Sequence, residues 1–517
     1  MKHFRNAAFA VALGLFYSGH AKAAPDSDTL IVGLSADASS FDPANMDSRD
    51  NLNIAQHIFG TLYSIKADGS IEPNFATAYK VSQDGKEYTF TIKPGLTCED
   101  GEALTAEDVA YSFNRAADPK NGFTGHAPGF LFPSIDFKSA EPVDDLNVKI
   151  KLGKKSGVVL GMISQVFIHC KDSYEKMTLD QAASKPVGSG SYKLVTWDHG
   201  SQIVLEKVKD PGVFKKIIFR IIPEASTRSA ELIAGNVDII TNVAPDQIEA
   251  IDNSGTAAVQ KVQGTRRIFV GFNFTDKFKG TKGIDAIKKP DVRRAMQYAL
   301  DVPSICEQLL KFKCERAAGL VNPPNDNPDL KPYPYNPAQA EKLLDAAGYR
   351  RGADGVRFEL KLQAPRGRYL NDANVALAIG QYLSDVGVKT DVELMEWASV
   401  YTPLYRDHAA GPMFLLGAGG ATWSPLYDMA LITTPKSETN FGEWNDPHWF
   451  KGWDAVDAAK TPEEERTAIN GMLKAFYDDS PWLLLYFQPD FYGVSKRITW
   501  QARRDEFIDL FDAKLAQ

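Results

Sequence analysis

The sequence has few histidines and cysteines, no excess of positive charge, and no long apolar run beyond its N-terminus. Lysine and arginine number 58 against 66 aspartates and glutamates, which gives a formal charge of −8. A nucleic-acid-binding protein would carry a basic excess or a basic cluster, so this class is excluded. Hydrophobic residues make up 44% of the 517 residues, which is an ordinary globular composition. The length exceeds what one hydrophobic core serves, so we expect two or three lobes.

The sequence also lacks the short motifs that mark common catalytic centres. It contains no HExxH, GxSxG, GxxxxGK[ST] or GxGxxG pattern, and its eight histidines are scattered singly. An SxxK pattern at Ser173–Lys176 has no KTG partner. A pair of glycosidase carboxylates could be present among the many acids, but no pattern selects two of them. We therefore predict a protein that is not an enzyme and that holds no metal or cofactor.

The N-terminus carries the features of an export signal. Within residues 1–23, a positively charged start precedes the apolar stretch Ala7–Tyr17 and the small-x-small cleavage signal Ala21-Lys22-Ala23. This is typical of a Sec-type signal peptide, and the apolar stretch is too short to span a bilayer. The next residue is Ala24 rather than cysteine, so no lipid anchor is indicated. We expect a soluble protein in the periplasm of a Gram-negative cell.

Four cysteines, Cys98, Cys170, Cys306 and Cys314, fit an oxidising compartment. Four thiols allow three pairings, which the sequence alone does not resolve. We favour Cys306–Cys314, whose members lie eight residues apart around the end of a predicted helix, together with Cys98–Cys170. There is no CxxC motif, so neither a zinc knuckle nor a thioredoxin-like redox site is expected.

Hydrophobic periodicity predicts strands and helices along the whole chain. Helices are predicted at 51–62, 105–115, 225–233, 292–300 and 374–386. Strands are predicted at 29–36, 87–96, 148–152, 192–195, 203–207, 217–222, 237–240, 358–362 and 389–394. The helix at 105–115 begins with a capping box, in which Thr105 is the cap and Asp108 its partner. The order mixes hairpins with strand–helix–strand units and has no repeat, which predicts an α/β or α+β fold with several lobes.

Six short segments, in order along the chain, carry a recognisable family pattern. They are Phe41–Pro43 with Gly60–Tyr63, Tyr88–Val109, Pro186–Tyr192, Val292–Asp301, Gly367–Asp372 with Val386–Val388, and Asn440–Pro447. The second reads YTF followed by GLTCEDGEALTAEDV, and the third reads PVGSGSY. Together they resemble the family 5 extracellular solute-binding proteins, which are the receptors of peptide, nickel and opine ABC importers.

The resemblance implies an α/β, two-lobed Venus-flytrap fold of the periplasmic-binding-protein type. Lobe I would comprise residues 26–265 and 488–517, with an extra subdomain inserted at about 73–183, and lobe II would comprise 266–487. Strands near Arg266–Phe272 and Leu484–Phe491 would cross between the lobes. The ligand would lie in the cleft, and closure of a monomeric receptor would present it to an inner-membrane ABC permease.

The resemblance also bears on the ligand. In the family's peptide receptors, the segment that matches 416–428 carries an aspartate that pairs with the peptide's α-ammonium group. Here Ala421 stands in that place, which argues against a peptide. The small residues of this segment expose backbone amides, and Arg366 and Arg368 can hold a carboxylate or phosphate through two hydrogen bonds. Such a cleft is similar to those of receptors for opines and for sugar phosphodiesters such as agrocinopines, so we expect an anionic or sugar-like ligand.

The residues expected to bind this ligand combine cations, flat aromatic faces and small side chains. They are Arg366, Arg368, Tyr369, Trp397, Gly419, Gly420, Ala421, Thr422, Trp423, Asn440, Gly442 and Trp444. The tryptophans could equally serve packing and the arginines could be solvated. One alternative is a peptide receptor with Asp428 or Glu443 as the ammonium partner. Another is a periplasmic hydrolase or chaperone.

Overall fold

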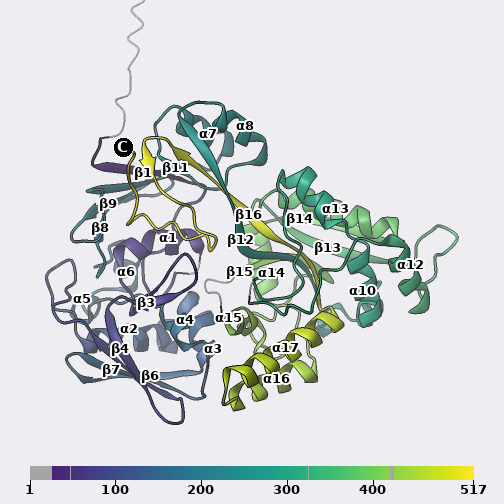
Figure 1. Ribbon diagram of the computed structural model, residues 1–517, viewed down its shortest axis with the longest axis horizontal. Coiled ribbons are helices and arrows are strands. Elements are labelled where there is room, and N and C mark those ends of the chain that lie inside the picture. Colours follow the sequence, from purple (N-terminus) through teal and green to yellow (C-terminus); the bar gives the residue numbers. More distant parts are fainter. Residues whose placement is uncertain (1–25, 47, 324, 420–423) are drawn as a thin grey trace, which may run out of the picture.

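A mixed sheet of ten strands runs through the protein (Figure 1). The computed structural model describes residues 26–46, 48–323, 325–419 and 424–517. Across the sheet, the strands follow in the order β14 (Val388–Glu396), β13 (Phe358–Arg366), β15 (Met413–Gly419), β12 (Ala257–Phe272), β16 (Trp482–Ser495), β11 (Ile239–Ile240), β1 (Thr29–Leu34), β10 (Lys216–Ile221), β9 (Gln202–Lys207) and β8 (Tyr192–Asp198). The sheet therefore has one half built from the first 240 residues and another built from residues 358–419.

The two longest strands, β12 and β16, lie in the middle of this sheet and belong to both halves. β12 has 16 residues and β16 has 14, all of them buried in β16. Residues 257–263 pair with one end of β16 and residues 267–271 with the other end. Between these stretches, residues 264–266 stand opposite Gln488 alone, which is a bulge in β12. The predicted lobe boundaries fall at this bulge and stay a prediction.

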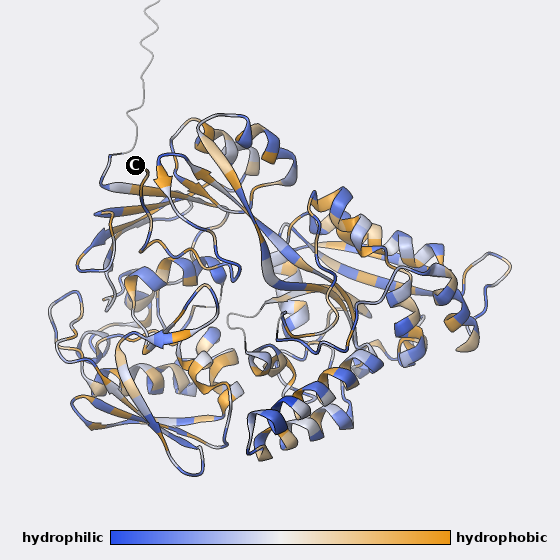
Figure 2. Cartoon of the chain, viewed as in Figure 1, coloured by the Kyte–Doolittle hydropathy of each residue, from blue (hydrophilic) through white to orange (hydrophobic). Residues whose placement is uncertain are grey.

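Helices cover each half of the sheet with their apolar faces. In one half, α10 (Pro290–Tyr298), α12 (Pro337–Ala346) and α13 (Asp372–Asp385) meet β13 and β15 in one buried cluster, for example through Val292, Val375 and Leu360. In the other half, α1 (Arg49–Ile58) and the C-terminal segment pack on β1, β9 and β10. Figure 2 shows the result, with hydrophilic residues on the outward faces of α16 (Pro447–Ala458) and α17 (Pro462–Asp479).

A separate sheet of four antiparallel strands lies beside the N-terminal half. Its order is β4 (Ala76–Val81), β5 (Glu87–Ile92), β7 (Asn147–Leu152) and β6 (Phe137–Asp144), and α2 (Ala106–Ala117) packs on it. The capping box of α2 is confirmed, because Thr105 accepts from Glu107 and the Asp108 carboxylate accepts from the Thr105 amide. This unit corresponds in sequence to the subdomain expected at about 73–183.

The remaining elements are short. They are β2 (Tyr63–Ile65), β3 (Ile71–Pro73), α3 (Phe132–Ile135), α4 (Val159–Ile163), α5 (Lys171–Tyr174), α6 (Leu179–Ser184), α7 (Ala225–Ile233), α8 (Ile248–Asp252), α9 (Ile284–Ile287), α11 (Val302–Ile305), α14 (Thr402–Arg406), α15 (Pro425–Met429), β17 (Ile498–Thr499) and β18 (Lys514–Leu515). In the described part of the chain, no helix is long and apolar enough to cross a lipid bilayer. The predicted signal peptide, residues 1–23, lies outside that part.

Both favoured disulfides are present. Cys98 is bonded to Cys170 and Cys306 to Cys314, which confirms the pairing favoured from the sequence. The first bond links the loop before α2 to the start of α5, across 72 residues. The second closes a loop of eight residues after α11.

Candidate ligand-binding site

A cavity of about 1380 Å³ lies between the two halves of the large sheet. One wall consists of the loop after β1, the first turns of α1 and the segment 241–246. The opposite wall consists of the loop 367–371 after β13, the helical turn that begins at Trp397, and the end of β15. The bulge of β12 and part of β16 lie between them. Ligand pockets of drug size measure about 300–1,000 Å³, so this cavity has room for a larger ligand.

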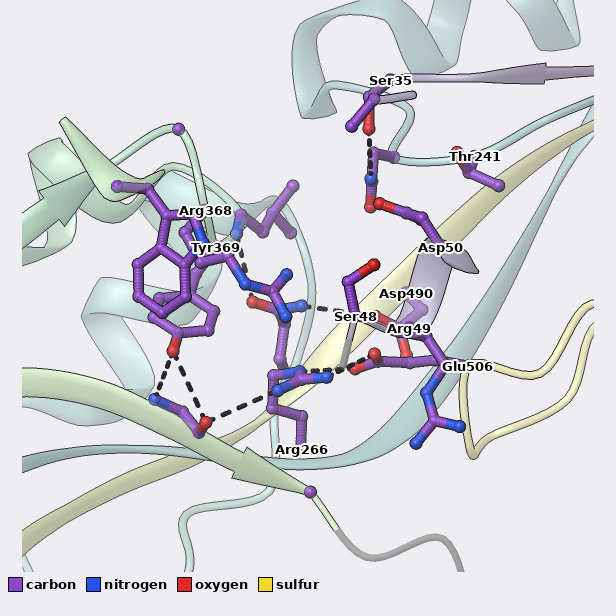
Figure 3. Close-up of a pocket in the computed structure, with 18 of the residues that line it drawn as sticks. Ser35, Ser48, Arg49, Asp50, Thr241, Arg266, Arg368, Tyr369, Asp490 and Glu506 are labelled. Carbon is purple, nitrogen blue, oxygen red and sulfur yellow. Dashed lines mark hydrogen bonds and ion pairs between the residues drawn. The ribbon is translucent and has the colours of Figure 1, made fainter. Parts of the chain in front are cut away.

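An ion pair joins the bulge of β12 to the C-terminal segment. The Arg266 guanidinium donates to both carboxylate oxygens of Glu506, at 2.6 and 2.5 Å (Figure 3). Burial acts to raise the pKa of Glu506, but the charge and hydrogen bonds of Arg266, together with the charges of Arg49 and Arg368, hold that pKa well below its ordinary value. Asp490 of β16 lies nearby, and burial together with the Glu506 charge raises its pKa.

The loop after β13 places the Arg368 guanidinium at the opposite wall of the cavity. The Asp372 carboxylate accepts hydrogen bonds from the backbone amides of residues 367, 368 and 369, which fixes the loop. The Arg368 guanidinium lies over the rings of Tyr369 and Trp397, at 5.3 and 5.4 Å from their centroids. Tyr369 is itself held by the Gly417 amide, which donates to its hydroxyl at 2.8 Å. The aromatic rings thus orient a guanidinium whose donors face the cavity (Figure 3).

The start of α1 supplies two further charges that the sequence analysis missed. Ser48 caps this helix by accepting from the Asn51 amide. The Arg49 side chain lies over the Phe507 ring at 4.2 Å, and its Nη1 is buried without an acceptor among the described residues. Burial raises the pKa of the half-buried Asp50 carboxyl, and Arg368 is the positive charge that lowers it most. A run of polar residues directly before a predicted helix was the only sequence signal for this wall.

The structure brings together only some of the residues expected from the sequence. Arg368, Tyr369, Trp397 and Gly419 line the cavity. Arg366 is exposed at the end of β13 and is not part of the described lining. Gly420, Ala421, Thr422 and Trp423 lie outside the described residues.

Three further expected residues form a buried turn behind the cavity. The Asn440 side chain accepts from the Trp444 amide at 3.1 Å and donates to the Trp444 carbonyl at 2.8 Å. The Trp444 indole donates to Asp479 at 2.6 Å. A side chain at Gly442 would collide with the Phe272 carbonyl, 2.1 Å from the position of its Cβ. These contacts stabilise a structural turn, and none of the three residues is among the described residues that line the cavity.

Of the two acids considered as ammonium partners, Asp428 lines the cavity but is paired with another side chain, and Glu443 lies outside the described lining. Asp428 is fully buried, lies 3.3 Å from the Arg267 guanidinium and accepts from the Asn322 amide. Glu443 lies 3.7 Å from His408 and outside the described lining of the cavity. Neither geometry presents a free carboxylate to a ligand.

One group of side chains has the spacing of a metal site within the described residues, but its chemistry does not fit one. The group consists of Glu102, Asp108 and Cys170. Cys170 is bonded to Cys98, and Asp108 caps α2, so the thiolate and carboxylate that a metal needs are already engaged.

Comparison with known proteins places these features in a family. The family model of the bacterial extracellular solute-binding proteins, family 5, matches residues 70–440. The glutathione-binding protein GsiB of Pectobacterium atrosepticum is 24% identical over 509 residues, which is 94% of each chain.

Two solved structures share the fold. One is the periplasmic binding protein DppA of Helicobacter pylori, in complex with the peptide STSA, with a TM-score of 0.81 and 21% identity over 95% of this chain and 98% of that one. The other is AgaA of A. tumefaciens R10, in complex with agropinic acid, with a TM-score of 0.79 and 23% identity over 95% of this chain and 99% of that one. These matches confirm the predicted two-lobed α/β fold. The protein belongs to the family 5 bacterial extracellular solute-binding proteins.

Proposed function

We propose that this receptor captures a small non-peptide ligand, anionic or sugar-like, such as an opine or a sugar phosphodiester. Members of the family are substrate-binding receptors of ABC importers and non-enzymatic transport proteins. We further propose that the protein acts as a monomer in the periplasm, after removal of residues 1–23, and delivers its ligand to an inner-membrane permease.

The orientation of Arg368 carries this proposal. Its guanidinium has no carboxylate partner among the described residues, and two aromatic rings fix it toward the cavity. An unpaired guanidinium is planar, and it can donate two parallel hydrogen bonds to the oxygens of a carboxylate or a phosphate. The shared fold of AgaA, which binds agropinic acid, supports the same class of ligand.

A peptide ligand is the second candidate, and the size of the cavity favours it. A volume of about 1380 Å³ exceeds what an ordinary small molecule fills. The relatives point the same way, because GsiB is named for glutathione and DppA was solved with a four-residue peptide.

Thermal unfolding of the protein against two ligand pools separates these candidates. One pool contains di- to pentapeptides, and the other contains opines, sugar acids and phosphorylated sugars. A ligand at about 100 times its Kd stabilises the folded state by about 2.7 kcal/mol, which is easily measured. A shift with the second pool alone supports the proposal, whereas a shift with peptides alone refutes it.

Arg366, at the end of β13, and Arg368, in the loop that follows, provide a matched pair of variants for the same assay. Arg368→Ala removes the oriented guanidinium and should abolish the shift with anionic ligands. Arg366→Ala removes the same charge from an exposed position two residues away, so the shift should persist. An unchanged shift in Arg368→Ala would contradict the role of this guanidinium.

A further inference from the structure

Two charges face each other across the cavity without a partner. Arg368 comes from the loop after β13 and Asp50 from the first turn of α1, so they belong to opposite walls (Figure 3). No described residue forms a hydrogen bond or an ion pair with the Asp50 carboxylate or with the Arg368 guanidinium. The Thr241 hydroxyl on the Asp50 side is also buried without a partner in the described chain.

The other acids of the lining are already engaged or lie in solvent. Glu506 is paired with Arg266, and Asp428 with Arg267. Asp37 accepts from the Trp197 indole at 2.9 Å and from the Gly200 amide at 2.8 Å. Asp490 accepts from the Gln488 side chain through Oδ1 at 3.3 Å, and its Oδ2 is buried without a partner among the described residues. Asp246 is exposed. Asp50 is thus the carboxylate of the described cavity wall that is half-buried and has no hydrogen bond or ion pair on either oxygen.

A half-buried charge without a partner is costly, because it has lost part of its hydration and gained no hydrogen bond or ion pair in return. Burial indeed raises the pKa of Asp50. A ligand that supplies a cation would remove this cost, just as a ligand carboxylate would satisfy Arg368. Asp50 and Arg368, which face each other from opposite walls, thus indicate two charges that their ligand would carry.

We propose that Asp50 is the anionic anchor of the site and accepts hydrogen bonds from a positively charged nitrogen of the ligand, while Arg368 holds a carboxylate of the same molecule. The ligand class is then a zwitterion derived from an amino acid, which favours opines over sugar acids and phosphodiesters. This inference rests on the proposed function and narrows it. Such a zwitterion would bridge the two walls of the cavity.

A purely structural role for Asp50 has a different signature. A negative charge in the first turn of a helix interacts favourably with the helix dipole. Loss of that interaction lowers the stability of the ligand-free protein and affects all ligands alike. Loss of an anchor weakens only those ligands that carry a positive charge.

Titration calorimetry with matched ligands tests the anchor. The probes are an N-(1-carboxyethyl) amino acid with a charged amine, its N-acetyl derivative without that charge, and gluconate as an anion alone. A dipeptide and its N-acetyl form make a second pair. Each probe is measured on the parent protein, on Asp50→Asn, and on Asp246→Asn as the control acid of the same lining.

A charge-assisted hydrogen bond contributes enough to predict a loss of about 10- to 100-fold. We expect the parent to bind the charged probe at least about 10-fold more tightly than its N-acetyl form. Asp50→Asn should remove this discrimination and leave gluconate binding intact, and Asp246→Asn should retain it. Thermal unfolding of the three ligand-free proteins identifies any loss that is only structural.

The outcomes separate the inference from the proposed function. Equal binding of the charged and acetylated probes, or unchanged binding of the charged probe by Asp50→Asn, would overturn the anchor even if gluconate binds. Binding of the dipeptide alone, with discrimination that Asp50→Asn removes, would refute the non-peptide ligand and uphold the anchor. Binding of the dipeptide alone, with discrimination that survives in Asp50→Asn, would refute both.

Discussion

Arg266 and Glu506 lie 240 residues apart in the sequence, yet they form the most complete ion pair of the cavity wall. No local pattern connects them, because the contact depends on where the C-terminal segment passes the bulge of β12. Asp50 was missed for the same reason. Its proposed role depends on its position opposite Arg368 and on the contacts that engage other acids of the lining, and neither follows from the sequence. By contrast, Arg368, Tyr369 and Trp397 do line the cavity, and a family pattern marks the loop of Arg368 and Tyr369. That these residues bind a ligand stays a prediction.

Removing the Glu506 charge should destabilise the protein strongly. Glu506→Gln leaves the largely buried Arg266 guanidinium without its counter-charge, and breaking a buried pair in this way costs about 3 kcal/mol. Urea unfolding measures the loss. Asp28→Asn breaks the exposed pair with Lys215 and should leave the midpoint unchanged. Equal midpoints for Glu506→Gln and the parent would show that the pair contributes nothing.

Buried His57 should make stability depend on pH. Burial lowers the pKa of His57 from 6.5 to about 4, so the unfolded chain takes up a proton first as the pH falls. Stability that is present above about pH 6.5 is therefore lost between this pH and about pH 4. At about pH 5, the expected loss from His57 is about 2 kcal/mol.

Unfolding free energies of two variants across this range test the assignment to His57. His57→Gln should flatten the pH dependence. His448→Gln, at an exposed position, should retain it. A parent-like slope in His57→Gln would assign the dependence to another group.

At the scale of elements, periodicity predicted the helix at 225–233 at its observed bounds and the helix at 374–386 to within two residues. Strands β13 and β14 extend beyond their predicted ends because they pair with each other over nine residues. The crossing strands were expected at 266–272 and 484–491 but run over 257–272 and 482–495. The full length of these strands depends on their pairing with each other, across more than 200 residues of sequence, and hydrophobic periodicity carries no information about such pairing.

The bulge of β12 requires glycine at position 264. A Cβ there would lie 2.4 Å from the Asp490 carboxylate and 2.5 Å from the Gln488 carbonyl. Gly264→Ala should therefore destabilise the protein by about 1–3 kcal/mol, as overpacking does. Gly471, inside α17, meets nothing within 4 Å, so Gly471→Ala should stabilise by about 0.5–1 kcal/mol. Chemical unfolding of both variants checks the opposite signs, and equal signs would contradict the steric argument.

At the scale of the whole molecule, the two-lobed fold was predictable because the family pattern recurs in six segments spread over the chain. The volume and charge pattern of the cavity were not predictable, because they depend on loops of both halves that lie far apart in the sequence and come together only in the folded protein. The segment 420–423, on which part of the ligand argument depended, lies outside the described residues. The ligand class therefore rests on Arg368 and Asp50.

The two disulfides should contribute unequally to overall stability. In the loop-entropy model, closing 72 residues contributes about 4 kcal/mol and closing eight residues about 2.5 kcal/mol. The double variant Cys98→Ser with Cys170→Ser should thus shift the midpoint of chemical unfolding further than Cys306→Ser with Cys314→Ser. A larger shift in the second pair would contradict the dependence on loop length.

The position of β16 in the sheet also fixes the order in which the protein can assemble. β16 lies between β12 and β11, although it begins only at residue 482. A chain that is synthesised or threaded through a pore N-terminus first has both neighbouring strands long before the one that joins them. Until the last segment arrives, no strand connects β12 with β11, and Arg266 has no Glu506. Assembly therefore ends at the C-terminus, and a chain interrupted before residue 482 carries two unfinished halves rather than a shorter receptor.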